Sequence, residues 1–365
     1  MSFDHGGTVY ATARALGCPP SELLDFSASI NPLGLSSSIR AACLAALDQA
    51  PHYPDPSCRR LVEALSAYHA IDSSSIAVAN GSTRLIHLLP ELFPHRSALI
   101  VAPAFSEYRH SLQRQNRPYH EHLLSPADGF TLDPDRLAQD LHRHRPGLLY
   151  FCNPGNPSGR LYTPAEITAL LALCRQYEVL PVLDEAFIDF CGEQFSHKQA
   201  VISGGQGVVL RSLTKFYALA GLRLGCAFAA PELAQRIRDA LPPWEVNTVA
   251  QFAGTAALAD HAHADATREL ITAERRLLSD TLQRLPGLRL FPSSANYLLL
   301  ELTGAMHAPQ LCERLLRTHR IMARDCSNFS GLGDRFLRVA VRSRAENERL
   351  IEALRTELSG RERTD

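Results

Sequence analysis

Short apolar segments alternate with amphipathic helical segments across the middle of the chain, and this pattern constrains the fold more than any other feature. Apolar strands are predicted over 75–80, 97–103, 146–154, 179–187 and 207–213. Segments with helical periodicity are predicted over 83–93, 106–116 and 163–178. Strands that are apolar on both faces and alternate with helices are typical of a parallel sheet covered on both sides. The sequence therefore predicts an α/β fold with a mostly parallel sheet sandwiched by helices.

The rest of the chain is expected to add an arm and a second domain. Residues 1–35 are irregular and punctuated by Pro and Gly, which favours an N-terminal arm that packs with the small domain. Residues 36–250 contain the alternating segments and form the predicted large domain. A long helical region over about 250–285, followed by short strands and helices, predicts a smaller α/β C-terminal domain over 251–365. A chain of 365 residues is long enough for two domains.

Charge and composition exclude several classes of partner. The net charge is −1, which gives no indication of a nucleic-acid or acidic-membrane partner. No apolar run reaches 18 residues, so no membrane span is expected. The nine cysteines include no C-x-x-C pair, which argues against a zinc ribbon or disulfide framework and favours a reducing cytoplasm. The histidine pairs 142/144 and 261/263 lie in predicted polar helices, so no metal site is predicted.

Two of the predicted strand ends carry polar groups suited to binding a ligand. Active sites in open α/β sheets lie at the carboxyl ends of strands. The segment NGST at 80–83 places Ser82 and Thr83 at a helix start, where free N–H groups and hydroxyls bind phosphate; an ordinary helix cap is the alternative. The segment NPGNPSG at 153–159 offers an Asn amide to a ligand oxygen, with a plain turn as the alternative.

Two further strand ends carry charged groups in apolar surroundings. The segment DEAF at 184–187 ends a very apolar strand, so Asp184 faces either an arginine or a cationic ligand atom. The segment SLTK at 212–215 contains one of only two lysines among 37 basic residues. Its apolar flank FYALAGLRLG predicts burial, which would lower the pKa of Lys215 and make the amine nucleophilic; a solvated lysine is the alternative. Lys198 lies in the polar stretch GEQFSHKQA and is expected at the surface.

The joint order and spacing of these motifs resemble the fold-type I pyridoxal phosphate enzymes, the aspartate aminotransferase superfamily, from about residue 25 to 342. The resemblance implies a seven-stranded-type sheet, pyridoxal 5′-phosphate as cofactor and a homodimer with shared active sites. It implies a catalytic Lys215 that forms a Schiff base with the cofactor and an Asp184 that pairs with the pyridinium nitrogen. An inactive, regulatory member would be expected to lack one of these two residues, and both are present.

The resemblance implies further cofactor and substrate contacts. Asn156 would hydrogen-bond the ring 3′ oxygen and Phe105 would stack on the ring. The cofactor phosphate would be held by Ser82, Thr83, Ser212 and Arg223, with Tyr53 reaching over from the neighbouring subunit. Substrate contacts are assigned to Arg338, which would bind the α-carboxylate, and to Arg324, His5 and Asn31.

Two subfamilies compete for the reaction. The SLTK and NPGNPSG segments are similar to those of histidinol-phosphate aminotransferases. Three other features resemble threonine-phosphate decarboxylases of cobalamin biosynthesis: HGG at 5–7 followed by DFSASINPLG at 25–34, RDCSNFSGLG at 324–333, and Phe187 where aminotransferases usually have a tyrosine. Each has an alternative, namely a flexible terminus, a surface salt bridge of Arg324 and core packing of Phe187. The resemblance favours decarboxylation of a phosphorylated amino acid over transamination.

Overall fold

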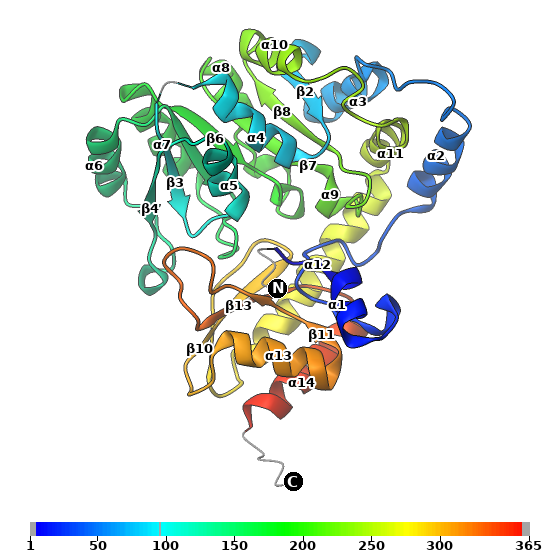
Figure 1. Cartoon of the computed structure of the whole chain (residues 1–365), viewed down its shortest axis with the longest axis vertical. Coiled ribbons are helices and arrows are strands. Elements are labelled where there is room, and N and C mark those ends of the chain that lie inside the picture. The colour runs from blue at the N-terminus through cyan, green and yellow to red at the C-terminus, as the bar shows by residue number, and fades with distance from the viewer. Residues whose placement is uncertain (1–4, 95, 360–365) are drawn as a thin grey trace.

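The computed structural model describes residues 5–94 and 96–359, and its centre is a seven-stranded sheet (Figure 1). The first four residues of the expected arm and the last six of the expected C-terminal domain lie outside the described residues. In spatial order the strands are β2 (Ile76–Ala79), β8 (Gly225–Ala229), β7 (Val208–Ser212), β6 (Leu180–Asp184), β5 (Leu148–Cys152), β3 (Ala98–Ala102) and β4 (Tyr119–Leu123). Strand β8 runs opposite to the other six strands of this sheet, which are parallel to one another. The predicted α/β class with a mostly parallel sheet is confirmed.

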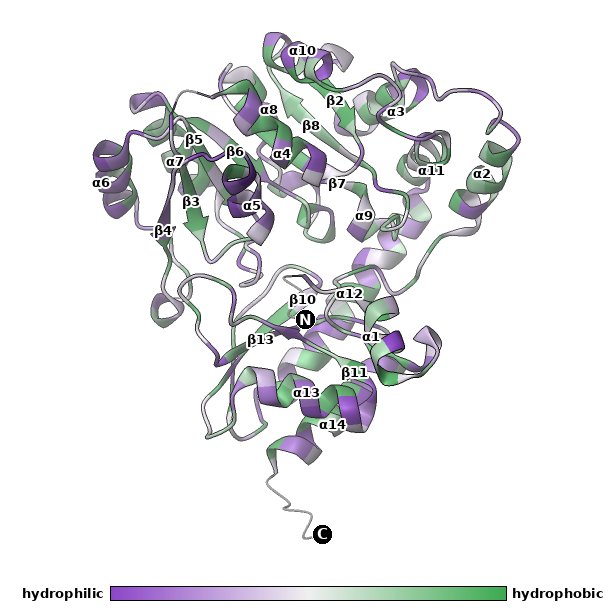
Figure 2. Cartoon of the chain, viewed as in Figure 1, coloured by the Kyte–Doolittle hydropathy of each residue, from purple (hydrophilic) through white to green (hydrophobic). Residues whose placement is uncertain are grey.

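Helices cover both faces of this sheet because successive residues of each strand point to opposite sides. In β7, Val208 and Leu210 pack with α4 (Ser82–Leu92), α5 (Ser106–Arg114) and α10 (Pro231–Ala240). Val209 points the other way and belongs to the core with α3 (Arg59–His69), α6 (Pro134–His144), α7 (Pro164–Gln176) and α8 (Lys198–Ser203). Figure 2 shows the strands as a hydrophobic layer between helices with polar outer faces.

A second, antiparallel sheet forms the smaller unit below the large one in Figure 1. Its order is β12 (Arg324–Asp325), β13 (Phe336–Ala340), β10 (Tyr297–Leu302) and β9 (Leu288–Leu290). The helices α13 (Ala308–His319) and α14 (Arg344–Leu358) pack with it, together with α12 (His261–Leu282). A smaller α/β unit after the large one is therefore present.

The N-terminal segment lies between the two units. It contains α1 (Val9–Leu16) and β1 (Leu24–Asp25), and β1 pairs in parallel with β11 (Ile321–Met322) of the small unit. The segment also contacts the large unit, because the backbone N–H of Asn31 donates to the carbonyl of Lys215 at 3.0 Å. It therefore links both units beside α9 (Leu213–Phe216).

The structure differs from the sequence-based predictions in three respects. Strands β4 and β8 were not predicted from the sequence. The helical region 250–285 is two helices, α11 (Thr248–Ala259) and α12, which meet at Asp260; α11 packs against α2 (Ser37–Leu47). Lys198 was expected at the surface, but it is 6% exposed and its ammonium pairs with Glu193. No helix among the described residues is long and apolar enough to cross a membrane.

Candidate active site

A cavity of about 220 Å³ lies where the carboxyl ends of the parallel strands face the small unit and the N-terminal segment. The structure brings together twelve residues that the sequence analysis singled out, eleven as ligands and Phe187 as a mark of the subfamily. They are His5, Ser82, Thr83, Phe105, Asn156, Asp184, Phe187, Ser212, Lys215, Arg223, Arg324 and Arg338. Two predicted site residues, Tyr53 and Asn31, do not line it. The cavity therefore collects groups that lie up to 333 residues apart in the chain, from His5 to Arg338.

Lys215 brings an amine into this cavity from the short helix α9, which follows β7 directly. No hydrogen bond or ion pair joins its Nζ to another described residue. Burial, followed by the positive charges of Arg338 and Arg223, lowers the pKa of Lys215 to about 8. A substantial fraction of the amine is therefore neutral, and nucleophilic, near neutral to mildly alkaline pH.

Asp184 ends β6 and supplies a buried carboxylate in the same cavity. Its Oδ2 accepts a hydrogen bond from the Tyr108 hydroxyl at 2.6 Å, and its Oδ1 accepts one from the Ala186 N–H at 3.0 Å. Burial raises the pKa of the Asp184 carboxyl above its ordinary value, whereas these two hydrogen bonds act in the opposite direction. No arginine pairs with it among the described residues, so the salt-bridge alternative is not realised. A cationic ligand atom would complete its electrostatic environment.

Two close backbone approaches form one corner of the cavity. Gly81 precedes α4 with φ +82°, and a Cβ there would lie 2.7 Å from Nη2 of Arg223. At Gly225 a Cβ would lie 2.4 Å from the backbone nitrogen of Ser82. Glycine at 81 therefore lets Arg223 lie against the helix start, and glycine at 225 lets β8 approach the backbone of Ser82. The resulting corner combines a guanidinium, the N-terminus of α4 and hydroxyls, which suits a phosphate group.

The small unit contributes two arginines to the opposite side of the cavity. Arg324 of β12 and Arg338 of β13 are cross-strand partners, so their side chains lie on one face of the sheet. The Arg338 guanidinium donates to Oδ1 of Asn156 and to the carbonyl of Ser27, and its buried Nε has no hydrogen-bond partner among the described residues. Arg324 donates to Oδ1 of Asn328 at 2.8 Å and is 8% exposed, so its side chain is buried rather than at the surface.

Asn31 is buried beside the cavity rather than in it. Its Nδ2 donates to the carbonyl of Phe216 and to Oγ1 of Thr267, both at 2.8 Å. Its Oδ1 accepts from the N–H of Leu33 at 3.0 Å. These bonds use the amide to fasten the N-terminal segment to α9, so the side chain is not presented to a ligand in the cavity.

Tyr53 lies at the surface, away from the cavity of its own chain. Its side chain is 78% exposed and its ring stacks on Trp244 with centroids 4.5 Å apart. Within one chain Tyr53 therefore contributes nothing to this cavity.

Sequence reasoning did not assign roles to several residues that build the site. Ser29, in the segment DFSASINPLG, lines the cavity with a buried hydroxyl that has no hydrogen-bond partner within residues 5–94 and 96–359. Tyr108 supports Asp184 from one helical turn after Phe105, a spacing that places both on one side of α5. Phe329 also lines the cavity, beneath the guanidinium of Arg324. In the sequence, the one indication that these residues belong to the site is that each lies within or next to a motif assigned to it.

Comparison with known proteins shows which family this chain belongs to. Residues 21–354 match the family described as aminotransferase class I and II. The chain is 39% identical over 360 residues to a threonine-phosphate decarboxylase of Salmonella typhimurium, covering 98% of this chain and 97% of that protein. It is 33% identical over 355 residues to a histidinol-phosphate aminotransferase of Symbiobacterium thermophilum, covering 97% and 95%.

The fold agrees with that assignment. A histidinol-phosphate aminotransferase of Clostridium acetobutylicum superimposes with a TM-score of 0.86 at 27% identity, over 92% of this chain and 99% of that one. The cavity itself has the parts that the family needs, because a lone amine, a buried carboxylate and an anion-binding corner surround one space. The chain therefore belongs to the class I and II aminotransferase family of fold-type I enzymes, whose cofactor is pyridoxal 5′-phosphate.

Proposed function

We propose that the chain decarboxylates L-threonine O-3-phosphate to (R)-1-aminopropan-2-ol phosphate and CO₂, as a cytoplasmic step of cobalamin biosynthesis. The observation that carries this proposal is the cross-strand pair Arg324 and Arg338 on the substrate side of the cavity. A phosphorylated amino acid has two anionic groups, and this pair offers one guanidinium to each. The similarity to the Salmonella typhimurium decarboxylase supports the same substrate class.

The residues present fit the cofactor, and we assign their roles accordingly. Arg223, Ser82, Thr83 and Ser212 would hold its phosphate at the anion-binding corner, and Phe105 would stack on its ring. Asp184 would face the ring nitrogen as an anion. Nδ2 of Asn156 makes no hydrogen bond to a described residue and is available to the ring 3′ oxygen. When bound, the cofactor supplies an electron sink for the bond that breaks at Cα.

The chain's own residues would then orient the substrate. Arg338 is held by Asn156 and Ser27 and would bind the carboxylate, while Arg324 and His5 would bind the phosphate. Anchoring the phosphate sets which Cα bond stands perpendicular to the cofactor ring, and only that bond is weakened. Lys215 lies within the same cavity and would return a proton to Cα after CO₂ leaves.

The lining of the cavity beside Asp184 supports decarboxylation over transamination. Phe187 lines the cavity where a tyrosine would place a hydroxyl, and it packs edge-on against Tyr297 with centroids 4.9 Å apart. The Tyr297 hydroxyl donates to the carbonyl of Gly155 at 2.7 Å, so it does not substitute for the hydroxyl that a tyrosine at position 187 would supply. Histidinol-phosphate aminotransferase is the second candidate, favoured by the 33% identical relative and the close superposition.

A product assay tests the proposal. Pure, cofactor-loaded protein is incubated with O-phospho-L-threonine while CO₂ is followed, and separately with histidinol phosphate and 2-oxoglutarate while glutamate is followed. We expect CO₂ and aminopropanol phosphate without glutamate. Glutamate without CO₂ would establish the aminotransferase instead. If neither product forms, both proposed substrates are wrong.

A single substitution tests the phosphate site. Arg324→Ala should raise the KM for O-phospho-L-threonine on the order of 10- to 100-fold, because a hydrogen bond to a charged group is worth about 1.5–3 kcal/mol. Arg317→Ala is a suitable control, since that side chain is 70% exposed on α13. A KM for Arg324→Ala equal to that of the control would place the substrate phosphate elsewhere.

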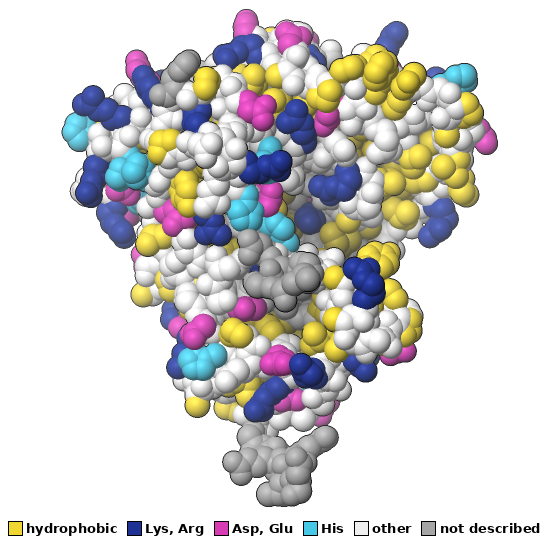
Figure 3. Space-filling model, viewed as in Figure 1, with side chains coloured by type: hydrophobic (Ala, Val, Ile, Leu, Met, Phe, Trp, Pro, Cys, Tyr) yellow, Lys and Arg dark blue, Asp and Glu magenta, His cyan; other side chains and the backbone are white. Residues whose placement is uncertain are grey.

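We further propose that the protein is a homodimer in which Tyr53 reaches the cofactor phosphate of the neighbouring subunit. Exposed apolar side chains gather around Tyr53: Leu44 and Leu47 of α2 are 62% and 56% exposed, and Trp244 is 46% exposed. Figure 3 shows hydrophobic side chains concentrated on this side of the molecule, over α2 and α11. A contiguous apolar surface of this kind is typical of a protein–protein interface.

A further inference from the structure

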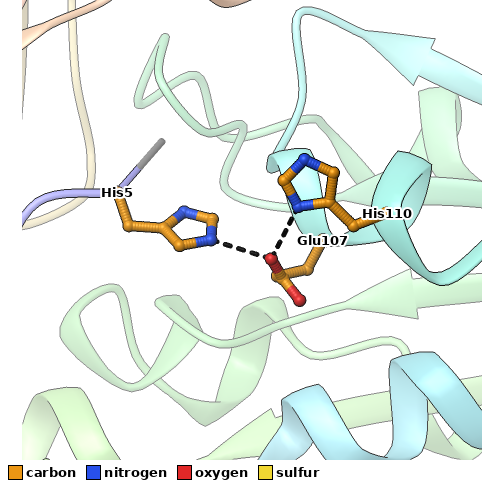
Figure 4. Close-up of side chains that lie close together, drawn as sticks. All are labelled: His5, Glu107 and His110. Carbon is orange, nitrogen blue, oxygen red and sulfur yellow. Dashed lines mark hydrogen bonds and ion pairs between the residues drawn. The ribbon is translucent and has the colours of Figure 1, made fainter. Parts of the chain in front are cut away.

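Three histidines surround one carboxylate at the edge of the cavity, and the proposed function assigns a role to His5 alone among these four residues. Glu107 lies in the first turn of α5. Its Oε1 contacts Nε2 of His5 at 2.8 Å and Nδ1 of His110 at 2.9 Å. Its Oε2 contacts Nε2 of His87 at 2.7 Å. Figure 4 shows the imidazoles of His5 and His110 converging on the same carboxylate oxygen from different segments of the chain.

We propose that His5, Glu107 and His110 form a binding site for a divalent transition metal of the Zn²⁺ class. Their three ligand atoms lie within 4.8 Å of one another. Zinc binds imidazole nitrogen and carboxylate oxygen at roughly 2.0–2.2 Å, so its ligands stand roughly 3.3 Å apart in a tetrahedron. The two separations from Glu107 Oε1, 2.8 and 2.9 Å, need to open by about half an ångström, and the two imidazole nitrogens, which lie within 4.8 Å of each other, need to reach the same spacing by side-chain rotation.

The set of ligands matches zinc in chemistry as well as in spacing. Two histidines and one carboxylate leave a fourth position for water or another ligand, which is a common arrangement at zinc sites. His87 adds a supporting contact, because it binds the carboxylate oxygen that the metal would not use and so orients Glu107. The side chains of Glu107, His87 and His110 are 16–29% exposed, which leaves an entry path for an ion.

A metal bound to this cluster would join the N-terminal segment to the large unit at the edge of the cavity. His5 belongs to the N-terminal segment and lines the cavity with Gly6, whereas Glu107 and His110 belong to α5 of the large unit. Without a metal, His5 contacts α5 through its hydrogen bond to Glu107 at 2.8 Å, and the Gly7 N–H donates to Ser27 Oγ within the N-terminal segment itself at 2.9 Å. A metal bound to all three ligands would fasten residues 5–7 across the cavity edge. This inference does not depend on which reaction the enzyme catalyses.

The direct test is metal binding to the cofactor-loaded, chelator-treated protein. Zn²⁺ is titrated calorimetrically into wild type and into His110→Ala, a substitution outside the proposed substrate and cofactor contacts. We expect one high-affinity Zn²⁺ per chain in wild type and at least about a 100-fold loss of affinity in His110→Ala. His87→Ala should lose about 10- to 100-fold, as for other residues that orient a ligand. His261→Ala is the matched control, since that histidine lies on α12, and it should bind as wild type does.

A second measurement reports the position of the segment rather than activity. Zn²⁺ should slow amide hydrogen exchange at Gly6 and Gly7 in wild type and in His261→Ala, and leave it unchanged in His110→Ala. The proposal is overturned if His110→Ala binds Zn²⁺ as tightly as wild type, because the metal then sits on other groups such as cysteines. Absence of stoichiometric binding in wild type would equally overturn it and leave the cluster as a set of hydrogen bonds.

Discussion

At the scale of single residues, the site depends on two ionisable groups whose protonation is shifted in opposite senses. Burial favours the neutral amine at Lys215 and the neutral acid at Asp184. Hydrogen bonds from Tyr108 and Ala186 oppose the effect of burial at Asp184, whereas nearby arginines reinforce it at Lys215. The site therefore combines a lysine with a lowered pKa and an aspartate whose anionic form is stabilised by two hydrogen bonds.

The pKa of Lys215 predicts how the cofactor-free protein recovers its cofactor. Since only the neutral amine attacks the cofactor aldehyde, the rate of covalent attachment should rise with pH and level off above about pH 8, well below the ordinary value of 10.5. Stopped-flow absorbance measures this rate. Lys215→Ala should show no lysine-bound absorption at any pH. A rate that continues to rise up to pH 10 would contradict the lowered pKa.

The same shift has a consequence for the cofactor-free fold. Between about pH 8 and 10.5 the unfolded chain binds the proton at this amine that the folded chain has released. The free energy of unfolding therefore gains a contribution from Lys215 that increases as the pH rises through this window.

Tyr108 offers a test of how firmly Asp184 is held as an anion. Tyr108→Phe removes the hydroxyl that donates to Oδ2 but keeps the ring, so we expect kcat to fall on the order of tenfold. Asp184→Ala should lose most turnover while retaining some cofactor. Tyr150→Phe is a matched control, because its ring stacks on Tyr108 at 4.9 Å while its hydroxyl bonds Ile86 instead. Equal kcat values for the two Phe variants would remove Tyr108 from the mechanism.

At the scale of elements, the strands that carry the motifs were predictable and two others were not. Strands β5, β6 and β7 are apolar on both faces because both faces are covered, and such runs stand out in a sequence. Strand β4 is YHEHL at the sheet edge, where polar residues are tolerated, and β8 is GCAFA, whose small residues lack a strand signature. Because β8 itself was not predicted, its antiparallel direction in the sheet could not be predicted either.

The boundary between the units also needed the structure. Apolar residues continue from α11 into α12, so the sequence reads as one helical region. Asp260 interrupts it, and its side chain caps α12 by accepting from the N–H of His263 at 3.1 Å. Because α11 packs on α2 and α3 while α12 packs on α14, we propose the boundary near Asp260 rather than at 250.

The element that presents Lys215 rests on a buried ionic network, which predicts a large effect on stability. Arg211 of β7 is 2% exposed and binds Glu185 at 3.1 Å and Asp189 at 2.6 Å, and also contacts Glu193. Arg211→Met would leave the carboxylates of Glu185 and Asp189 buried without their arginine partner, at a cost of about 3–5 kcal/mol. Urea unfolding measures the change. Arg59→Met removes only an exposed pair with Glu63 and should stay within about 1 kcal/mol of wild type. Similar unfolding midpoints for both variants would refute the network's role.

At the scale of the whole molecule, the strand-end motifs predicted most of the cavity because parallel strands end at one edge of a sheet. The sequence could not show which other segments lie close together, because no comparable rule places them. Asn31 was expected to bind substrate, yet its amide fastens α9, because the N-terminal segment passes beside the cavity before reaching α2. The cluster of His5, Glu107 and His110 was also missed, since its ligands come from segments about a hundred residues apart.

The proposed dimer is the last property that belongs to the whole molecule, and a surface substitution tests it. Stable interfaces bury about 1,200–2,000 Å² in total, and exposed leucines at their centre do not tolerate charge. The double variant Leu44→Asp, Leu47→Asp should therefore sediment as a monomer, whereas we expect the wild type to sediment as a dimer. Activity should fall together with dimerisation, because each cavity would lose Tyr53 of its neighbour.

The matched control uses an exposed leucine on another part of the surface. Leu123 at the end of β4 is 44% exposed and lies away from α2 (Figure 1), so Leu123→Asp should remain dimeric and active. Tyr53→Phe separates the two effects, since it should preserve the dimer while weakening cofactor retention through the loss of one hydroxyl. If the double aspartate variant remains a dimer, the interface lies elsewhere. If it becomes a monomer with full activity, Tyr53 has no role in the neighbouring site.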